Sequence, residues 1–271
     1  MLSNLLKDRR RLAFGVSGAL ASNMVSRRQV ERLVRHARAQ DVSIFDTAPS
    51  YGSGEAERRL GAALAGDHDV VLMTKAGVSS SGLSARSRDF SPDGVLASVE
   101  ASLERLQRER IDLLWLHGPS VAELSDVLFE RLERIIDSGK VGYVGLTLTG
   151  RQISAARKHQ IVSALMTPVN PDMNDDGVAR IASVRAAGKA VFAIKAFAGM
   201  KAVRRFGTTG AIWRLAKVLS GDRLHPHVSH SAEDVVEFVF DKVECDVMVS
   251  TTTSLEHLEQ NSAMMRSVEL R

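Results

Sequence analysis

The sequence predicts an α/β fold, a single (β/α)8 barrel of the TIM type. Short apolar runs alternate with amphipathic helix patterns eight times, and the composition does not shift along the chain. Such an alternation is typical of parallel strands that are joined by helices. An open doubly wound sheet is the competing architecture, but no G-x-G-x-x-G follows the first apolar run. We therefore expect residues 1–271 to form one barrel domain, with an irregular, partly helical insertion around 199–230.

The predicted strands are short and rich in Val, Ile, Leu and Phe, as expected of parallel strands that are buried on both faces. Several of them end at a polar or charged residue, which places that residue at one rim of the barrel. In chain order, the predicted strands are 12–16, 42–45, 70–75, 111–116, 141–146, 161–167, 190–195 and 246–249.

A helix is predicted after each strand, in most cases from a Ser or Thr at the N-cap or from acidic residues in the first turn. Ser120 and Glu123, for example, form a capping box that is expected to open the helix after the fourth strand. The stretch between 75 and 91 is expected to be a loop rich in Ser and Gly. The predicted helix starts are 26–29, 55–57, 91–92, 120–123, 149–152, 175, 231–234 and 253–256.

The composition excludes several classes of protein. Hydrophobic residues make up 44% and charged residues 25% of the chain, which is ordinary for a globular protein. The net charge is +4, but the basic residues are scattered and aromatic residues reach only 5%, so a nucleic-acid groove is not expected. Cys245 is the single cysteine, which excludes an intramolecular disulfide and a cysteine-rich zinc site.

Targeting signals and membrane spans are also missing from the pattern. The polar, basic residues 1–11 are not followed by an apolar signal core, and no apolar run approaches the length of a membrane span. We therefore expect a cytoplasmic protein, monomeric or weakly homo-oligomeric, without nucleic-acid or membrane partners and without a metal.

Four polar residues stand where the second, third and fourth predicted strands end. Asp46 closes the second strand and Tyr51 follows it by five residues, Lys75 closes the third, and His117 closes the fourth. The carboxyl ends of barrel strands form the face on which active sites are built, so we expect these side chains to converge.

The four residue types together predict delivery of a proton. A lysine ammonium beside a tyrosine stabilises the phenolate, and a carboxylate bound to the lysine keeps that cation in place. A nearby histidine can hydrogen-bond a carbonyl oxygen. Taken singly, each residue has a more common structural interpretation, as a helix cap, a solvated rim lysine or a packed histidine. Their joint placement at successive strand ends favours chemistry.

Four segments resemble the aldo-keto reductase family: FDTAPSYGSGE at 45–55, TK at 74–75, IDLLWLHGP at 111–119 and GKVGYVG at 139–145. The resemblance extends from Leu12 to Asn261. It implies a (β/α)8 barrel that transfers hydride from a nicotinamide dinucleotide to an aldehyde or ketone. It further implies Tyr51 as the proton donor, with the other three rim residues as its partners.

The resemblance also implies where the cofactor binds. NADP(H) is the cofactor that the family favours, and NAD stays possible. Lys201, Arg204 and Arg205 could supply the positive charge that binds the 2′-phosphate of NADP(H). The substrate would be a small carbonyl compound, with Phe14, Phe90, Trp115 and Met173 as candidate apolar lining, although the place of Trp115 on a buried strand favours a core position for it. The implied cofactor-binding residues are Thr147, Met166, Asn170, Lys195, Ala196, Phe197, Ala198, Gly199, Met200, Ser250, Thr251, Thr252, Thr253, Ser254, His257 and Asn261.

The residues expected to bind the nicotinamide depart from the family pattern at three places. The usual Ser-Asn pair after the fifth strand is Thr147-Leu148, and the expected glutamine on the sixth strand is Met166. The stacking aromatic residue after the seventh strand is absent, with Ile194 or Phe197 in its vicinity. Thr147 and Asn170 are the candidates to take over part of the lost contacts.

Two other functions stay open on the sequence. A lysine at a strand end, Lys75 or Lys195, could form a Schiff base in an aldolase-like lyase. Alternatively, the chain could bind dinucleotide without turnover, as a sensor or a partner subunit.

Overall fold

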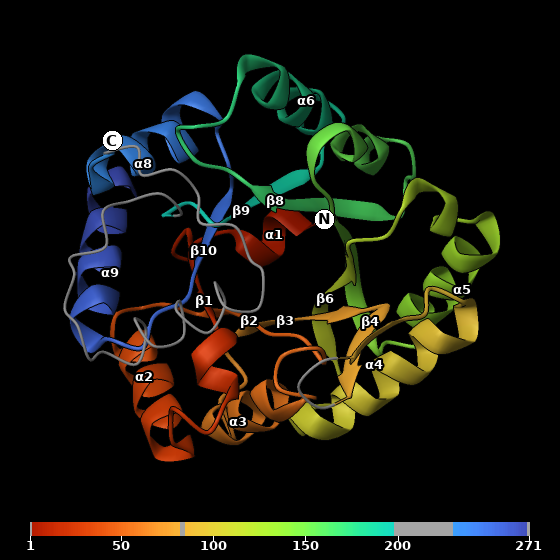
Figure 1. Cartoon of the computed structure of the whole chain (residues 1–271), viewed down its shortest axis with the longest axis horizontal. Helices are drawn as coiled ribbons and strands as arrows, with labels where there is room; N and C mark the ends of the chain where they lie inside the picture. Colours follow the sequence, from red (N-terminus) through yellow and green to blue (C-terminus); the bar gives the residue numbers. More distant parts are fainter. Residues whose placement is uncertain (1, 82–84, 198–229, 270–271) are drawn as a thin grey trace.

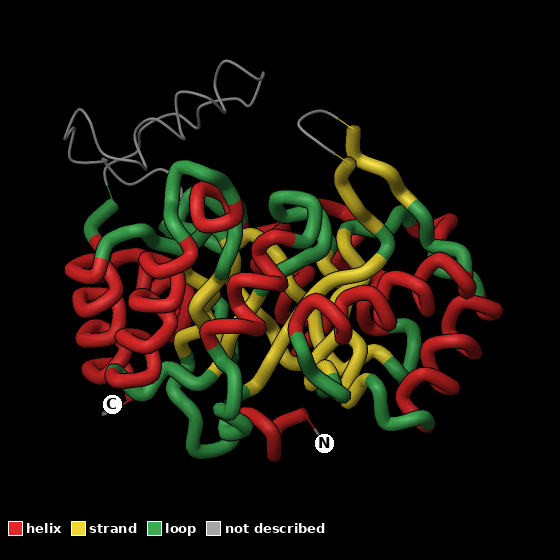
Figure 2. Tube along the Cα trace, turned by 90° about the horizontal axis from the view of Figure 1, so that it is seen from below, coloured by secondary structure: helices red, strands yellow, loops and turns green. Residues whose placement is uncertain are grey.

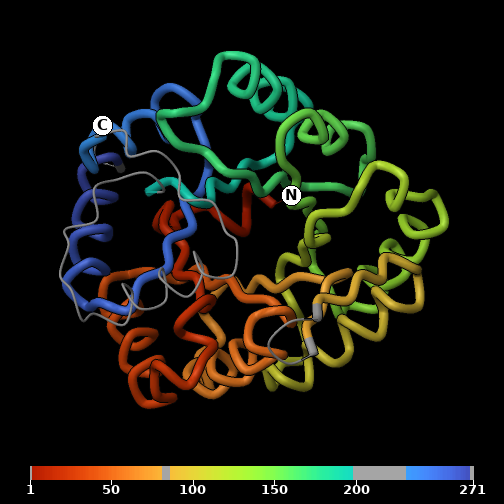
Figure 3. Tube along the Cα trace, viewed as in Figure 1, coloured from red at the N-terminus to blue at the C-terminus, as the bar shows by residue number. Residues whose placement is uncertain are grey.

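Eight parallel strands form a closed barrel. The computed structural model describes residues 2–81, 85–197 and 230–269. The strands pair in the closed order β1-β10-β9-β8-β7-β6-β3-β2, and the chain winds around the barrel in sequence order (Figure 3). Their bounds are β1 Leu12–Gly15, β2 Ile44–Asp46, β3 Val71–Ala76, β6 Ile111–His117, β7 Val141–Thr147, β8 Val162–Pro168, β9 Ala190–Ile194 and β10 Val247–Ser250.

The predicted barrel is confirmed. Each predicted strand ends within one residue of an observed strand end, because the apolar run stops where the chain leaves the buried barrel wall. The expected insertion at 199–230 falls almost wholly on residues outside those that the structure describes, as do Ala198, Gly199 and Met200.

Helices surround the barrel (Figure 1). The α-helices are α1 Leu2–Leu6, α2 Arg27–Ala39, α3 Glu55–Ala63, α4 Pro92–Leu106, α5 Asp126–Asp137, α6 Asp175–Ala186, α8 Ala232–Glu237 and α9 Leu255–Glu269. Shorter helical pieces are the 3-10 helices η1 Gly18–Ala21, η2 Val121–Glu123 and η3 Gly150–Arg157, and the π-helical turn η4 Phe238–Lys242.

Capping explains most of the helix starts. The Ser26 side chain accepts a hydrogen bond from the Gln29 N–H (3.2 Å), and the Ser91 side chain accepts one from Gly94 (3.1 Å). These bonds satisfy backbone donors that the first helical turn leaves without a partner. Both starts agree with the sequence prediction.

Three predicted starts were wrong in detail. The Ser120–Glu123 capping box forms, but it opens η2, and α5 begins three residues later behind Ser125. Thr149 makes no side-chain cap, and the helix after it is the 3-10 helix η3. The helix α9 begins behind Ser254, whose hydroxyl accepts from the His257 N–H (3.3 Å), and not behind Thr253.

The β4–β5 hairpin and α1 were not predicted. The strands β4 (Val78–Ser81) and β5 (Ala85–Arg88) form an antiparallel hairpin in the stretch expected to be a loop. Figure 2 shows this hairpin rising above the barrel, while α1 lies at the opposite end. Leu2 of α1 is buried and, with Leu5 and Leu6, packs against the residues inside the barrel.

Side chains alternate between the barrel interior and the helix layer, as the period of a strand requires. Ile44 belongs to the inner cluster, whereas Phe14 and Phe45 belong to the outer core and meet edge to face, with ring centroids 6.4 Å apart. The prediction that Phe14 lines a substrate pocket was therefore wrong. Trp115 lies inside the barrel against Phe192, with ring centroids 5.0 Å apart.

Gly145 makes room for the Trp115 ring. A Cβ atom at Gly145 would lie 2.3 Å from that ring and 3.1 Å from the Ala164 carbonyl oxygen. The register of β7 against β8 also shifts between Val144 and Gly145. A side chain here would overfill a packed interior.

We predict that Gly145→Ala lowers the free energy of unfolding by about 1–3 kcal/mol, the usual range for overpacking a core. In a Trp115→Leu background the same change is expected to be much milder, because the clashing ring is gone. Urea denaturation of the four proteins of this double-mutant cycle measures the difference. An equal loss in both backgrounds would rule out the clash as the cause.

Candidate active site

The loop between β2 and α3 carries Tyr51 and is held by close packing. Gly52 has a φ of +61°, and a Cβ atom there would lie 2.2 Å from the Ala21 carbonyl oxygen of η1. This position therefore requires glycine for both its backbone conformation and its close contact. Tyr51 itself is partly buried against the outer core. The loop thus fixes Tyr51 just beyond the end of β2.

Lys75 and Asp46 form a buried ion pair at the ends of β3 and β2. The Lys75 Nζ donates to Asp46 Oδ2 (2.6 Å) and to the Thr47 carbonyl oxygen (2.8 Å). The two side chains are 2% and 7% exposed. Lys75 Nζ also lies 5.0 Å from the centroid of the Tyr51 ring. The ammonium is therefore fixed between the carboxylate and the tyrosine.

Burial and the neighbouring charges shift the pKa of Lys75 in opposite directions. Burial disfavours the ammonium, but the Asp46 carboxylate and Tyr51 outweigh it, so the pKa of Lys75 is raised above its ordinary value. Burial likewise raises the pKa of the Asp46 carboxyl, and the Lys75 ammonium opposes that rise. Lys75 thus stays a cation at neutral pH.

His117 faces Tyr51 from the end of β6. The two rings meet edge to face with centroids 6.0 Å apart, and His117 Nδ1 lies 3.5 Å from the Ser50 Oγ. Burial, together with the charges of Lys75, Arg86 and Arg88, lowers the pKa of His117 to about 3. The imidazole is therefore neutral at neutral pH. The structure thus brings together all four residues predicted at the strand ends.

Two predicted cofactor-binding residues, Thr147 and Met166, lie at the level of His117 on the next two strands of the barrel. His117 pairs with Thr147 in the register of β6 and β7, and Thr147 pairs with Met166 in that of β7 and β8. Thr147 Oγ1 is buried and has no hydrogen-bond partner within the described part of the chain. Met166 lies inside the barrel at 1% exposure. Asn170 is engaged in a turn, where its Oδ1 accepts from the Asp172 N–H (3.1 Å).

Three more of the predicted cofactor-binding residues, Lys195, Ala196 and Phe197, follow the end of β9. Lys195 is exposed and has a left-handed backbone, with φ of 55°, while Ala196 is buried. Phe197 packs against the outer core, whereas Ile194 packs against the barrel interior. Of the two residues expected near the nicotinamide ring, Ile194 is therefore the one beside the barrel mouth.

Hydroxyl groups gather where β10 leads into α9. Asn261 Nδ2 donates to Ser250 Oγ (2.9 Å), and Thr251 Oγ1 lies 3.3 Å from the Ser17 Oγ of the loop after β1. Thr252 Oγ1 accepts from the Ser254 N–H (3.1 Å). Within this segment Thr253 is partly buried, and His257 is exposed on the first turn of α9.

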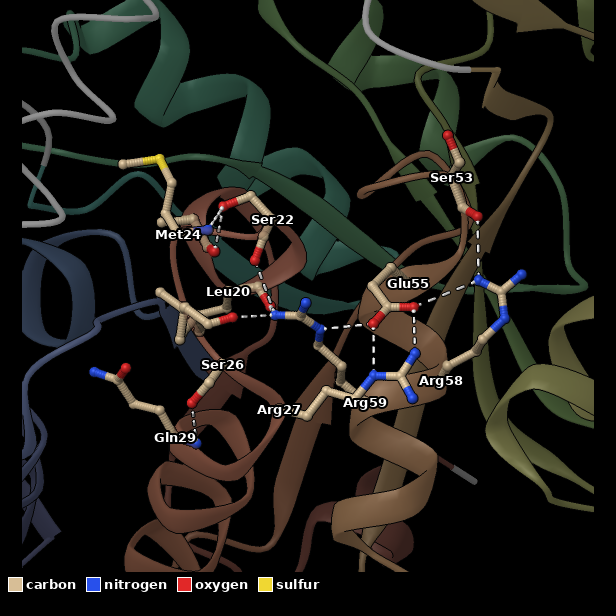
Figure 4. A network of polar contacts seen from close by, with 12 residues as sticks. Leu20, Ser22, Met24, Ser26, Arg27, Gln29, Ser53, Glu55, Arg58 and Arg59 are labelled. Carbon is tan, nitrogen blue, oxygen red and sulfur yellow. Dashed lines mark hydrogen bonds and ion pairs between the residues drawn. The ribbon is translucent and has the colours of Figure 1, made fainter.

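A polar network behind the Tyr51 loop was missed by the sequence reasoning. Arg59 is 5% exposed at its side chain, and its Nη1 donates to the carbonyl oxygens of Leu20 (2.9 Å), Ser22 (3.0 Å) and Val25 (2.6 Å). Its Nε donates to Glu55 Oε1 (2.9 Å), which also binds Arg27 (Figure 4). The network ties α3 to η1 and α2. No sequence pattern identifies a lone arginine in such a role.

Glu57 links the loop to β3 on the other side. It is fully buried and accepts from Thr74 Oγ1 (2.6 Å) and from Arg105 Nε (2.6 Å). The Arg105 side chain in turn lies against Gly54, where a Cβ atom would come within 2.6 Å of it. One carboxylate therefore connects the residue before Lys75 with the end of the Tyr51 loop. The sequence alone predicts Glu57 only as an acidic residue in the first turn of a helix.

A separate hollow of about 760 Å³ lies on the opposite face of the barrel, between residues before β1 and the end of α2. Its arginines are engaged in ion pairs: Arg9 with Asp69, Arg10 with Asp41 and Arg38 with Asp67. The four strand-end residues do not line it. This hollow is not the candidate active site.

Within the described residues, no helix has the length and apolarity that crossing a membrane requires. The same part of the chain contains no group of three or more His, Cys, Asp or Glu side chains that could hold a metal ion.

We predict that Arg59→Leu lowers the free energy of unfolding by about 2–4 kcal/mol, because three carbonyl groups and Glu55 lose a buried cationic donor. Arg58→Leu is the matched control. Arg58 is half exposed and lies 3.8 Å from Glu55, so its loss is expected to stay within about 0.5 kcal/mol. Guanidinium denaturation measures both, and similar losses for the two variants would contradict the role of Arg59.

We also predict that His117→Asn makes the fold less sensitive to acid. The folded protein binds a proton at His117 only near pH 3, whereas the unfolded chain binds it near pH 6.5. Between these values the unfolded state takes up the proton, so stability falls as the pH falls.

Urea denaturation of both proteins between pH 7 and pH 4 isolates this contribution, since the other titrating groups are shared. The wild type is expected to lose more stability than the variant over this range. Equal losses would mean that His117 is protonated in the folded state as readily as in the unfolded chain.

Several known proteins resemble this chain in sequence. Residues 11–200 match the sequence model of the Aldo/keto reductase family. An uncharacterized oxidoreductase of Mycobacterium tuberculosis is 34% identical over 141 residues, which cover 51% of this chain and 39% of that protein. The D-threo-aldose 1-dehydrogenase of a Pseudomonas species is 36% identical over 129 residues, 39% of each chain. The chain thus matches about two fifths of the length of these curated relatives.

Solved structures share the fold. A putative aldo-keto reductase from Pseudomonas aeruginosa superposes with a TM-score of 0.74 at 23% identity, covering 95% of this chain and 90% of that one. An aldo/keto reductase from Klebsiella pneumoniae, solved in complex with NADP and acetate, has a TM-score of 0.67 at 17% identity, covering 94% and 85%. With the family match over residues 11–200, we conclude that this chain belongs to the aldo/keto reductase family.

Proposed function

We propose that this chain is an oxidoreductase that uses a nicotinamide dinucleotide to reduce an aldehyde or a ketone to an alcohol, with Tyr51 as the proton donor. The observation that carries the proposal is the buried Lys75 ammonium, held by Asp46 at 2.6 Å and lying 5.0 Å from the Tyr51 ring. A fixed cation beside a phenol stabilises the phenolate that remains after proton transfer.

Each of the four residues has a distinct role in this mechanism. The Tyr51 hydroxyl gives its proton to the carbonyl oxygen, and Lys75 stabilises the phenolate left behind. Asp46 and the Thr47 carbonyl oxygen hold the ammonium in place. Neutral His117, with Nδ1 toward Ser50, donates a hydrogen bond from Nε2 to the carbonyl oxygen and orients it.

A nicotinamide dinucleotide, when bound, would supply the hydride that the carbonyl carbon accepts. The carbonyl oxygen takes the proton of Tyr51, so the product is the neutral alcohol, and solvent returns a proton to Tyr51. Acid catalysis by a positioned group of this kind contributes about a hundredfold to ten-thousandfold in rate.

The residues present fit a nicotinamide dinucleotide at two points. Thr147 Oγ1 is a buried hydroxyl without a partner among the described residues, next to His117 in the register, and it would bind the carboxamide. The hydroxyls and N–H groups from Ser250 to Ser254 would bind phosphate at the start of α9. NADP(H) is the proposed cofactor because the family favours it, and NAD is the alternative.

One observation favours a different function. Met166, which pairs with Thr147 on the neighbouring strand, has no polar side-chain group for hydrogen bonding to the nicotinamide carboxamide. The carboxamide would therefore make fewer contacts than in the family pattern. A protein that binds dinucleotide without turnover is therefore the second candidate. A Schiff-base lyase is less well supported, because the raised pKa of Lys75 keeps its amine protonated.

We predict that Tyr51→Phe lowers the kcat for reduction of 4-nitrobenzaldehyde with NADPH by a hundredfold or more, because the proton donor is removed. Tyr143→Phe is the matched control. Tyr143 is the other tyrosine of the chain and packs against the barrel interior, so its kcat is expected to stay within about threefold of the wild type.

Fluorescence titration of both variants with NADPH and NADH checks that cofactor binding survives. Full activity of Tyr51→Phe would refute the assignment of the proton donor. Tight dinucleotide binding by the wild type, with no oxidation of cofactor over a panel of aldehydes, would favour the binding protein instead.

A further inference from the structure

The β4–β5 hairpin is fixed over the candidate active site by contacts on two sides. Ser80 Oγ donates to the Ser50 carbonyl oxygen (2.9 Å), just before Tyr51, and lies 3.4 Å from the Ser53 Oγ. On the other strand, Arg88 Nη2 donates to the carbonyl oxygen of Gly118 (3.0 Å), the residue after His117. The hairpin therefore spans from the Tyr51 loop to the end of β6.

Arg86 lies between these two contacts and on the same face of the hairpin. In the antiparallel register Arg86 pairs with Ser80, and residues that pair across two strands share a face. Arg88 follows by two residues, which also places it on that face. The face that carries Ser80 and Arg88 makes the contacts to the active-site loops, so Arg86 is presented from the hairpin toward the site.

The charge of Arg86 is not neutralised within the described part of the chain. Lys75 is paired with Asp46, and Arg88 is paired with Glu123 (2.7 Å). Arg86 is exposed, and none of the ion pairs among the described residues includes it. It is close enough for its charge to lower the pKa of His117, together with burial, Lys75 and Arg88. Arg86 therefore adds a positive charge near His117 that no carboxylate among the described residues balances.

We propose that Arg86 binds the anionic group of the substrate, a carboxylate or a phosphate, while the carbonyl group of the same molecule faces Tyr51 and His117. An arginine presents its N–H groups in a planar fork that matches both anions. A positive potential at the mouth would also favour the approach of an anion. This inference rests on the proposed reductase function and names its substrate class.

The test compares charged substrates with neutral analogues of similar shape. 4-Carboxybenzaldehyde is paired with methyl 4-formylbenzoate, and D-glyceraldehyde 3-phosphate with D-glyceraldehyde. The wild type is expected to prefer the anionic member of at least one pair by roughly tenfold to a hundredfold in kcat/KM, the worth of a charge-assisted hydrogen bond. Which pair shows the preference separates a carboxylate from a phosphate.

Arg86→Gln is expected to abolish that preference by raising the KM of the anionic substrate, with the neutral partner unaffected. Arg32→Gln removes the same charge from an exposed position on α2 and is expected to keep the preference. A wild type that reduces charged and neutral substrates equally, or an Arg86→Gln variant that keeps the preference, would overturn the proposal.

A binding measurement separates this proposal from the reductase function. 4-(Hydroxymethyl)benzoate, glycerol 3-phosphate and their neutral counterparts are titrated calorimetrically into the wild type, Arg86→Gln and Arg32→Gln, each saturated with NADP⁺. Tighter binding of an anion that is lost only in Arg86→Gln supports the anion site even if no aldehyde is turned over. Reduction of the neutral aldehydes without any effect of Arg86→Gln on anion binding would retain the reductase and reject the site.

Discussion

The structure depends on keeping two opposite charges, Lys75 and Asp46, out of water. Moving a single ion into a protein interior is strongly unfavourable, and the attraction between the two repays this only when their geometry is close and further hydrogen bonds are made. Here Nζ meets Asp46 Oδ2 at 2.6 Å and the Thr47 carbonyl oxygen at 2.8 Å. Adjacent parallel strands supply that geometry, because β2 and β3 end side by side.

The loops that complete the site are fixed by polar contacts as well as by packing against the outer core. Arg59 binds three carbonyl groups of the segment before α2, and Glu57 links Thr74 to Arg105 behind the Tyr51 loop. Ser80 and Arg88 attach the hairpin. Tyr51 is thus positioned by residues that lie outside the four candidate catalytic residues. Their loss would move Tyr51 relative to Lys75 without touching either residue.

Sequence reasoning located the barrel and the strand-end residues well, because both follow from local pattern. An apolar run ends where the chain leaves the barrel wall, so a polar residue such as Lys75 or His117 is visible at the rim. The hairpin was missed because serines occupy three of the four positions of β4, and its pairing is a tertiary choice. Arg59 and Glu57 were missed for a similar reason, since most of their hydrogen-bond partners lie elsewhere in the chain. The Ser125 cap was missed because the Ser120–Glu123 capping box nearby is an equally good signal for a helix start.

Burial acts in the same direction on the two basic groups around Tyr51, but the charges near them differ in sign, and this difference leaves the two groups in different charge states at neutral pH. Burial disfavours the charged form of both Lys75 and His117. Lys75 has a carboxylate in contact and keeps its proton, with a raised pKa. His117 has the cations Lys75, Arg86 and Arg88 around it, so its pKa is lowered to about 3. One group is therefore a cation at neutral pH and the other a neutral imidazole, and the Tyr51 ring lies close to both.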